Sequence, residues 1–168
     1  LVAGDLVRVF NGRGEIVVRV EVGAELAKGR AWLPMHWGSR FMNSAGANAL
    51  TTGATDPYSF QPELKHAAVQ VAKAELPYPL AVVRRCADQA AALELLAAAR
   101  AFLPRLPYAT ATLYGRSNPL VVLRGALAEP AAPELLAELD QVFAMADAAG
   151  NIVYNDAQRR ISKRAINQ

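Results

Sequence analysis

The sequence changes character at residues 75–79 (ELPYP), which separate two stretches of different composition. Before this segment, β-branched residues alternate with polar ones, and glycine, asparagine, serine and threonine are frequent. After it, alanine and leucine dominate. Two prolines within three residues stiffen the backbone and favour an extended linker. We therefore predict two domains, residues 1–76 and residues 77–168.

The first domain is predicted to be rich in β-strands. Alternation of apolar and polar residues predicts four strands, at residues 6–10, 15–22, 30–35 and 66–73. The turn at 11–14 (NGRG) joins the first two strands as a β-hairpin. Pro34 has no backbone N–H to donate, so it marks the end of the third strand or the edge of a sheet.

The second domain is predicted to be a small α+β unit of two layers. Its elements are a strand at 81–84, a helix at 87–103, strands at 108–114 and 119–125, a helix at 131–143 and a final hairpin around 149–151. Pro104 ends the first helix and Pro133 begins the second, as is typical of proline at helix boundaries. Leucines recur on one side of each helix, which predicts an apolar face packed on a sheet.

Charge and hydropathy exclude several classes of protein. The chain is 53% hydrophobic and 20% charged, which excludes an intrinsically disordered chain. Its net charge of +3 comes from residues 151–168, because residues 1–150 hold 14 basic and 14 acidic residues. We therefore expect no extended basic face and no nucleic-acid partner. No apolar run approaches the roughly 20 residues that span a bilayer, so we expect no membrane partner. A single cysteine is compatible with a reducing cytosol, and we expect a cytoplasmic location.

The sequence contains few residues of the types that commonly act in catalysis or bind metals. The single cysteine, Cys86, excludes an internal disulfide and a cysteine-rich metal site, and with only two histidines we predict no metal site. Cys86 follows two arginines, which allows a lowered thiol pKa; the alternative is a structural role. No nucleophile motif or phosphate-binding glycine loop lies between a strand and a helix, so we predict no catalytic residue. The sequence begins at Leu1 rather than at a methionine, so we expect a piece of a longer polypeptide.

The most informative segment is the loop region at 34–65, which has little periodicity but many polar and aromatic residues. Loops of this length inside a compact domain are commonly functional. Amide, hydroxyl, cationic and indole groups together suit a large polar ligand that carries a heteroaromatic ring and phosphates. The alternative is a rigid loop whose side chains satisfy its own backbone. The groups belong to Trp37, Ser39, Arg40, Asn43, Asn48, Thr51, Ser59 and Lys65.

Several short motifs occur in order: GDLVRV at 4–9, PMHWG at 34–38, NALT at 48–51, DP at 56–57 and PELK at 62–65. In this order they resemble the C-terminal dinucleotide-binding domain of the molybdopterin oxidoreductases, over roughly residues 2–76. Within that family, HWGSR and QPELKH are most similar to the assimilatory nitrate reductases of bacteria. The resemblance implies a mixed fold, in which a double-psi β-barrel, partial here because the family's domain begins before Leu1, precedes the α+β domain.

The resemblance also implies a cofactor, bis-molybdopterin guanine dinucleotide with molybdenum. The family's cofactor-contacting asparagine falls on Asn48 and its lysine on Lys65, and both side chains suit heterocycle edges and phosphates. His36 and Trp37 fall where the family approaches the pterin, with a core position as the alternative. For Arg40 we expect a loop-bracing salt bridge, and a further cofactor contact is the alternative. The molybdenum ligand and the iron–sulfur cysteines of such enzymes lie in other domains.

We therefore expect a C-terminal fragment of a molybdenum-dependent nitrate reductase, an enzyme of nitrate assimilation that reduces nitrate to nitrite, and no activity from the fragment alone. Its expected partners are the remainder of the catalytic polypeptide and an electron-donor protein. A formate dehydrogenase or another oxyanion reductase is the alternative within the family. A third hypothesis is a non-catalytic module that docks an electron donor through the basic cluster at 159–164.

Overall fold

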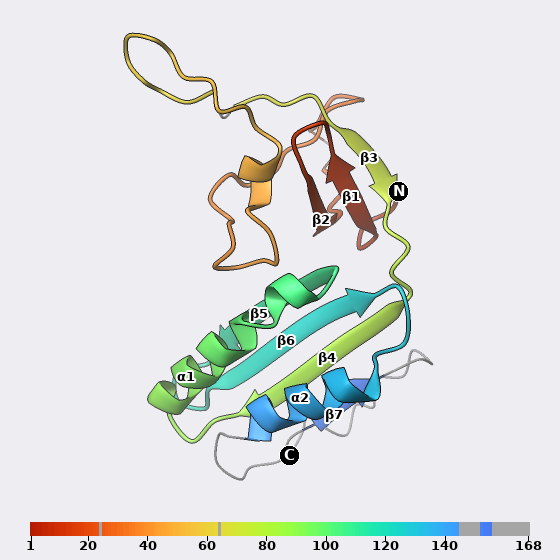
Figure 1. Cartoon of the computed structure of the whole chain (residues 1–168), viewed down its shortest axis with the longest axis vertical. Helices are drawn as coiled ribbons and strands as arrows, with labels where there is room; N and C mark the ends of the chain where they lie inside the picture. The colour runs from red at the N-terminus through yellow and green to blue at the C-terminus, as the bar shows by residue number, and fades with distance from the viewer. Residues whose placement is uncertain (24, 64, 145–151, 156–168) are drawn as a thin grey trace. The chain divides into compact units, whose positions relative to one another are not determined.

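A computed structural model describes residues 1–23, 25–63, 65–144 and 152–155, and the chain divides into two compact units, Leu1–Glu75 and Leu76–Gln168 (Figure 1). Within the described residues, the first unit contains an antiparallel sheet of three strands, and the second contains one of four strands and two α-helices. The mixed class predicted from the sequence is therefore confirmed. None of the described helices has the length and apolar character needed to cross a membrane.

The first unit is built on a β-hairpin. β1 (Leu6–Phe10) pairs antiparallel with β2 (Glu15–Arg19) across the predicted turn at 11–14. β3 (Gln70–Lys73) pairs antiparallel with the other side of β1, so the order in the sheet is β2-β1-β3. The long loop region between β2 and β3 contains a short 3-10 helix, η1 (Gly46–Ala49).

Several expectations for this unit differ from the structure, and the strand predicted at 15–22 ends at Arg19. Residues 30–35 do not form a strand: Pro34 removes a backbone donor, and Trp32 is 73% exposed, so the segment has no buried face to pack on a sheet. The strand predicted at 66–73 is limited to its last four residues. The three described strands form an open sheet, so the expected double-psi β-barrel is not confirmed.

The core of the first unit is small. Its buried apolar side chains are Val7, Ile16, Met42, Leu50 and Ala74. Most of the large apolar side chains that are exposed in the described part of the chain also belong to this unit. They include Trp32, Trp37, Phe41, Tyr58 and Phe60. The first unit therefore leaves much apolar surface uncovered.

The second unit follows the predicted order of strands and helices. Its elements are β4 (Tyr78–Arg85), α1 (Gln89–Arg100), the 3-10 helix η2 (Leu103–Arg105), β5 (Tyr108–Tyr114), β6 (Leu120–Leu127), α2 (Pro133–Ala144) and β7 (Ile152–Asn155). The strand predicted at 108–114 is confirmed residue for residue. β4 begins earlier than predicted, so Tyr78 and Pro79 of the predicted linker belong to the sheet. The hairpin predicted around 149–151 lies outside the described residues.

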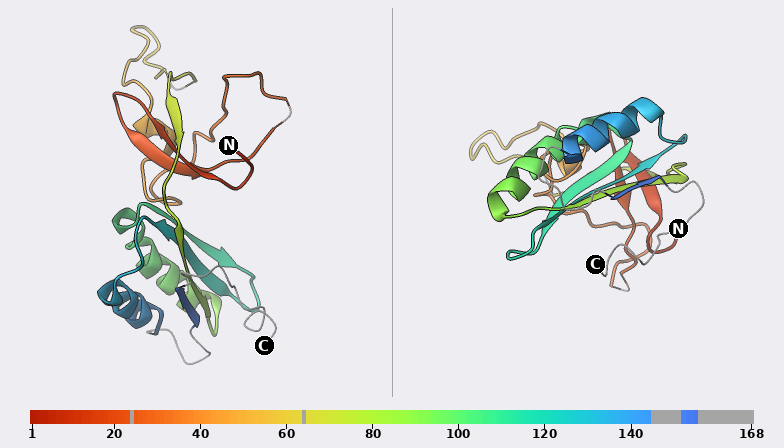
Figure 2. Two further views of the ribbon diagram at one scale, coloured as in Figure 1. Left: turned by 90° about the vertical axis from the view of Figure 1, so that its right-hand side faces the viewer. Right: turned by 90° about the horizontal axis from the view of Figure 1, so that it is seen from below.

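The four strands of the second unit form a sheet in the order β5-β6-β4-β7. β4 and β6 occupy its centre and pair from Tyr78 opposite Leu127 to Arg85 opposite Leu120. Both helices lie on the same face of this sheet (Figures 1 and 2). A β-α-β-β-α-β chain with this strand order is the split β-α-β arrangement. The second unit is thus a two-layer α+β unit, as the sequence predicted.

The core of the second unit lies between its sheet and its helices. Alternate residues of β4 are buried there, because successive side chains of a strand point to opposite faces. The buried core residues are Leu80, Val82, Cys86, Ala92, Leu95, Leu96, Ala99, Phe102, Leu103, Leu106, Ala109, Ala111, Val121, Leu123, Leu139 and Phe143. This core is much larger than that of the first unit, so among the described residues the second unit contains most of the apolar burial.

Arg84 follows Leu80 and Val82 on the face of β4 that points into the core, and it is only 3% exposed. Its guanidinium donates a hydrogen bond to the carbonyl of Phe143, near the C-terminal end of α2. The last carbonyls of a helix have no partner within the helix, and they form the negative end of its dipole. Arg84 therefore joins the sheet to α2 and satisfies one of these carbonyls.

Candidate functional site

The loop segment that carries His36, Trp37 and Arg40 is folded against η1. Gly46, the first residue of η1, has φ +65°, and a Cβ added there would overlap the carbonyl oxygen of Trp37. Only glycine fits this close approach of two backbone segments. The segment at 36–40 and η1 are therefore held together by backbone contact.

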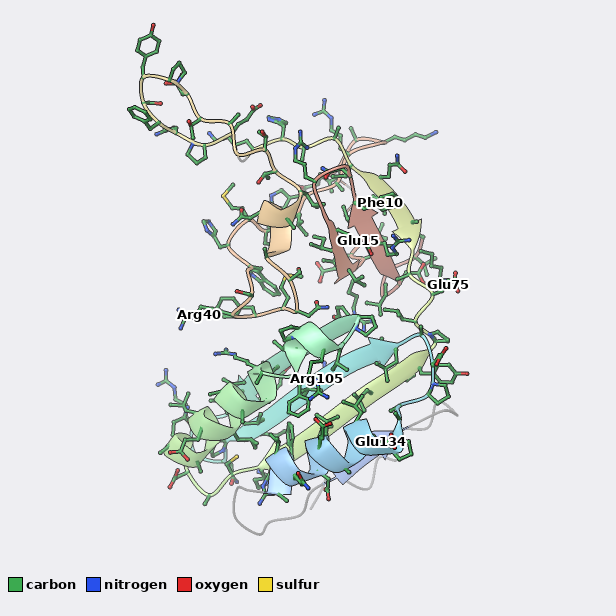
Figure 3. All side chains as sticks on the ribbon, viewed as in Figure 1. Phe10, Glu15, Arg40, Glu75, Arg105 and Glu134 are labelled. Carbon is green, nitrogen blue, oxygen red and sulfur yellow. The ribbon has the colours of Figure 1, made fainter. Side chains whose placement is uncertain are left out.

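The side chains of the segment at 36–40 are open to solvent. Trp37 is 57% exposed, and its ring lies near that of Phe41, with centroids 6.4 Å apart. His36 is also exposed, so the core position considered for His36 and Trp37 is wrong. Figure 3 shows the exposed Arg40 side chain directed away from the β-hairpin. No ion pair involves Arg40 within the described residues, so its expected salt bridge is absent there.

Asn48 lies on η1 with its side chain exposed. η1 is closed by the N–H of Leu50, which donates to the carbonyl of Ala47 at 3.0 Å. The hydroxyl of Thr51 donates to the backbone carbonyl of Asn48 at 3.3 Å. Within the part of the chain that the structure describes, the Asn48 side-chain amide has no hydrogen-bond partner. Its donor and its acceptor are therefore both available to a ligand.

The turn between β1 and β2 holds η1 in place. Nδ2 of Asn11 donates to the carbonyl of Leu50 at 2.9 Å and to that of Ala68 at 3.2 Å, so it joins the turn to η1 and to the segment before β3. A Cβ added to Gly14 would lie 2.6 Å from the carbonyl oxygen of Ala49. The sequence predicted this turn but missed its contact with η1. The available signal was an asparagine at the first position of the turn, since its side chain readily bonds nearby backbone groups.

Residues 54–63 form an irregular hairpin that extends from the rest of the unit (Figure 1). Thr55 and Pro62 form an antiparallel bridge. At the tip, Tyr58 is 92% exposed. Lys65 follows the hairpin and is also exposed.

Asp56 organises this hairpin. Its Oδ1 accepts hydrogen bonds from the N–H of Ser59 at 2.7 Å, the N–H of Tyr58 at 3.0 Å and the hydroxyl of Ser59 at 2.9 Å. These bonds, first of all the one from the N–H of Ser59, hold the pKa of the Asp56 carboxyl below its usual value. The hairpin therefore depends on the ionised form of Asp56.

The hairpin at 54–63 should lose order in acid. A carboxyl whose pKa is lowered by folding stabilises the folded form above its unfolded pKa, and that contribution is lost as the pH falls through the lowered value. In an NMR titration from neutral to strongly acid pH, the amide signals of Tyr58 and Ser59 should move toward random-coil positions, with a midpoint below the usual aspartate pKa. Asp56→Asn should abolish this transition. A midpoint at or above the usual value would contradict the role of Asp56.

The structure places the five predicted site residues on three parts of one loop region. These residues are His36, Trp37 and Arg40 on the first part, Asn48 on η1, and Lys65 after the hairpin at 54–63. The contact of Gly46 with Trp37 brings the first two parts together. Within the described residues, no hydrogen bond or ion pair ties Lys65 to the other two parts. The role of each residue in cofactor binding stays a prediction.

Cys86 and the metal-ligand residues add no second site. Cys86 is 3% exposed in the core of the second unit, and burial raises the pKa of its thiol, which favours the structural alternative over a reactive thiolate. Across the described ranges, no group of three histidine, cysteine, aspartate or glutamate side chains is placed to hold a metal ion. The loop region of the first unit therefore remains the candidate site.

The loop region and the β-hairpin that positions it lie within the part of the chain that matches a known family of domains. Residues 1–68 match the family described as Molydopterin dinucleotide binding domain. The resemblance drawn from the motifs is thus confirmed: the first unit carries a molybdopterin dinucleotide-binding domain, of the kind found in both nitrate reductases and formate dehydrogenases. Such domains belong to molybdopterin oxidoreductases, which are enzymes.

The similar proteins include two nitrate reductases. One, from Klebsiella oxytoca, is 39% identical over 72 residues, which are 43% of this chain and 8% of the relative. The other, from Synechocystis sp., is 41% identical over 59 residues, 35% of this chain and 8% of the relative. The F420-dependent formate dehydrogenase subunit alpha of Methanocaldococcus jannaschii is 37% identical over 68 residues, 40% of this chain and 9% of that protein. The chain thus spans less than a tenth of these relatives, and no solved structure matches it.

Proposed function

We propose that this chain is the C-terminal part of a molybdenum-dependent nitrate reductase and helps to bind bis-molybdopterin guanine dinucleotide. The observation that carries the proposal is the family match over residues 1–68, with two nitrate reductases among the relatives. When bound, the cofactor supplies the molybdenum at which nitrate is reduced to nitrite. The chain supplies binding groups; we assign it no catalytic residue and no activity on its own.

The exposed donor groups of the loop region fit such a cofactor. Asn48 offers a donor and an acceptor side by side, which matches the edge of a guanine or pterin ring. Arg40 and Lys65 carry exposed positive charges that match a pyrophosphate. Trp37 and His36 offer exposed rings on which a heterocycle can stack. Amide, cation and ring are thus present in one loop region, as this ligand requires.

The proposal extends to the fold and partners of the first unit. Its open sheet would be completed to a double-psi β-barrel and covered by the remainder of the catalytic polypeptide. The small core and the exposure of Trp37, Phe41 and Tyr58 support this packing, because large exposed apolar patches favour contact with another protein surface. An iron–sulfur cluster in another domain, an electron-donor protein, a cytoplasmic location and a role in nitrate assimilation follow from the same resemblance and belong to the proposal.

A formate dehydrogenase is the second candidate, because the similar proteins include a formate dehydrogenase subunit alpha. The two candidates share the domain and the cofactor and differ in substrate. Assays of the complete subunit with an artificial electron donor or acceptor, in parallel with nitrate and with formate, separate them. Turnover of nitrate alone supports the first candidate, and turnover of formate alone supports the second.

In the full-length protein, Asn48→Ala and Lys65→Ala should each lower the molybdenum content and the rate of nitrate reduction by about tenfold. A tenfold loss is what removal of one hydrogen bond to a charged phosphate or to a bound heterocycle would cause. Lys28→Ala is a suitable control, because Lys28 is an exposed lysine outside the candidate site and its loss changes the net charge as Lys65→Ala does. Normal molybdenum content and normal rate in both site variants would contradict the proposal.

A further inference from the structure

Arg13 lies beside η1, although it is distant from η1 in sequence. Its Nη1 donates to the carbonyl of Leu50 at 3.4 Å, and its backbone N–H donates to Oδ1 of Asn11 at 2.8 Å. Asn11 in turn donates to the same carbonyl of Leu50. The guanidinium of Arg13 is therefore directed to the end of the short helix that carries Asn48.

Arg13 also differs from the charged residues of the neighbouring strands. Nε and Nη2 of Arg8 donate to the two carboxylate oxygens of Glu15, at 2.7 and 2.6 Å. The ammonium of Lys73 lies 3.4 Å from a carboxylate oxygen of Asp5. Arg13 is exposed, and no carboxylate pairs with it within the described residues. A guanidinium has five N–H donors, so the single long contact with Leu50 leaves most of them available.

We infer that Arg13 is a further cofactor-binding residue, which contacts the pyrophosphate of the guanine dinucleotide while Asn48 contacts the ring. The inference rests on the proposed function. A planar guanidinium matches phosphate oxygens in pairs, and it gains specificity when its backbone is fixed. Here the backbone is fixed by the bonds of Asn11 and by the close approach of Gly14 to η1. The anionic part of the ligand would thus meet the turn at 11–14 and the heterocyclic part would meet η1, two segments joined by the hydrogen bonds to the Leu50 carbonyl.

The test compares guanosine diphosphate (GDP) with guanosine, which has the same base but no phosphate. The full-length protein, purified without its cofactor, is titrated with each ligand, and binding is measured by isothermal titration calorimetry. Arg13→Gln should weaken GDP binding by about tenfold and leave guanosine binding unchanged. Asn48→Ala should weaken both. Arg116→Gln is the matched control, because Arg116 is also an exposed arginine between two antiparallel strands, and its loss should change neither.

The outcomes separate this inference from the proposed function. If Asn48→Ala weakens both ligands and Arg13→Gln weakens neither, the role of Arg13 is overturned and the proposed function stands. If Arg13→Gln weakens GDP and guanosine equally, Arg13 only supports η1, and the phosphate contact is overturned. If Arg116→Gln weakens GDP as much as Arg13→Gln, the effect is one of net charge and the inference fails. If the unsubstituted full-length protein binds neither ligand, both the inference and the proposed cofactor site fail.

Discussion

Gly46→Ala should unfold the loop region of the first unit. The added Cβ would overlap the carbonyl oxygen of Trp37 and lie 2.8 Å from its carbonyl carbon, and backbone atoms cannot move aside as a flexible side chain can. The φ of +65° costs a residue with a Cβ about 1–2 kcal/mol, and overpacking adds about 1–3 kcal/mol. We expect the free energy of unfolding of this unit to fall by about 3 kcal/mol or more. For a unit with so small a core, this is a large fraction of its total stability.

Hydrogen exchange measured by NMR or mass spectrometry reports this change for each unit separately. Amides of η1 and of the hairpin at 11–14 should lose protection in Gly46→Ala, while those of β5 and β6 should keep it. Gly53→Ala is the matched control, because Gly53 lies in the same loop region and an added Cβ would meet nothing within 4 Å. Equal protection in the two variants would show that the contact of Gly46 with Trp37 does not hold the loop.

Arg84→Ala should destabilise the second unit by about 3 kcal/mol. The change removes a buried hydrogen bond from a charged donor, typically worth about 1.5–3 kcal/mol, and leaves the carbonyl of Phe143 without that partner. It also removes the long apolar stem of the arginine from the core, which leaves a cavity. Urea unfolding of the chain, followed by the circular dichroism of its helices, measures the loss.

Two further variants separate the causes. Arg84→Met keeps most of the volume and loses the hydrogen bond, so it should destabilise the unit by less than Arg84→Ala does. Arg85→Ala is the control from the next position of β4, where the side chain points to the opposite face and is half-buried; its effect should stay within about 0.5 kcal/mol. If Arg84→Ala and Arg85→Ala have equal effects, the contact with α2 does not stabilise the unit.

The second unit was predicted well because buried and exposed residues alternate regularly along its strands. In β5, Ala109 and Ala111 are buried, while Thr110 is half-buried and Thr112 is exposed, which is the alternation that the sequence displays. The start of β4 was missed because Pro79 favours a linker. Pro79 precedes Leu80, where the described pairing of β4 with β7 begins, so on that side of the strand it lies at an edge.

The first unit was predicted less well, because alternation describes which way side chains face and does not say whether a partner strand exists. Apolar and polar residues alternate enough in 30–35 to suggest a strand, but the described strands pair without this segment. The pairing of β3 with β1 begins only at Gln70, opposite Phe10. Just before Gln70, the carbonyl of Ala68 accepts a hydrogen bond from the side chain of Asn11 in the turn and not from a strand.

The candidate site was predicted in part. The resemblance supplied His36, Trp37, Arg40, Asn48 and Lys65 as candidates, and the structure exposes all of them. The contacts of Arg13 with Leu50 and of Gly46 with Trp37 were missed, because no local pattern indicates them. Contacts between turns distant in sequence depend on the completed fold, whereas periodicity describes only neighbouring residues.

The pairing of β7 with β4 makes the second unit a self-contained module. The chain enters this unit at the start of β4, and the last residue of β7, Asn155, lies opposite Leu80 near that same end of the strand. A unit whose first and last strands are neighbours can be added to a loop of another protein, or removed from it, with little strain on the host backbone. The same geometry would let this unit be transferred between host chains as one piece.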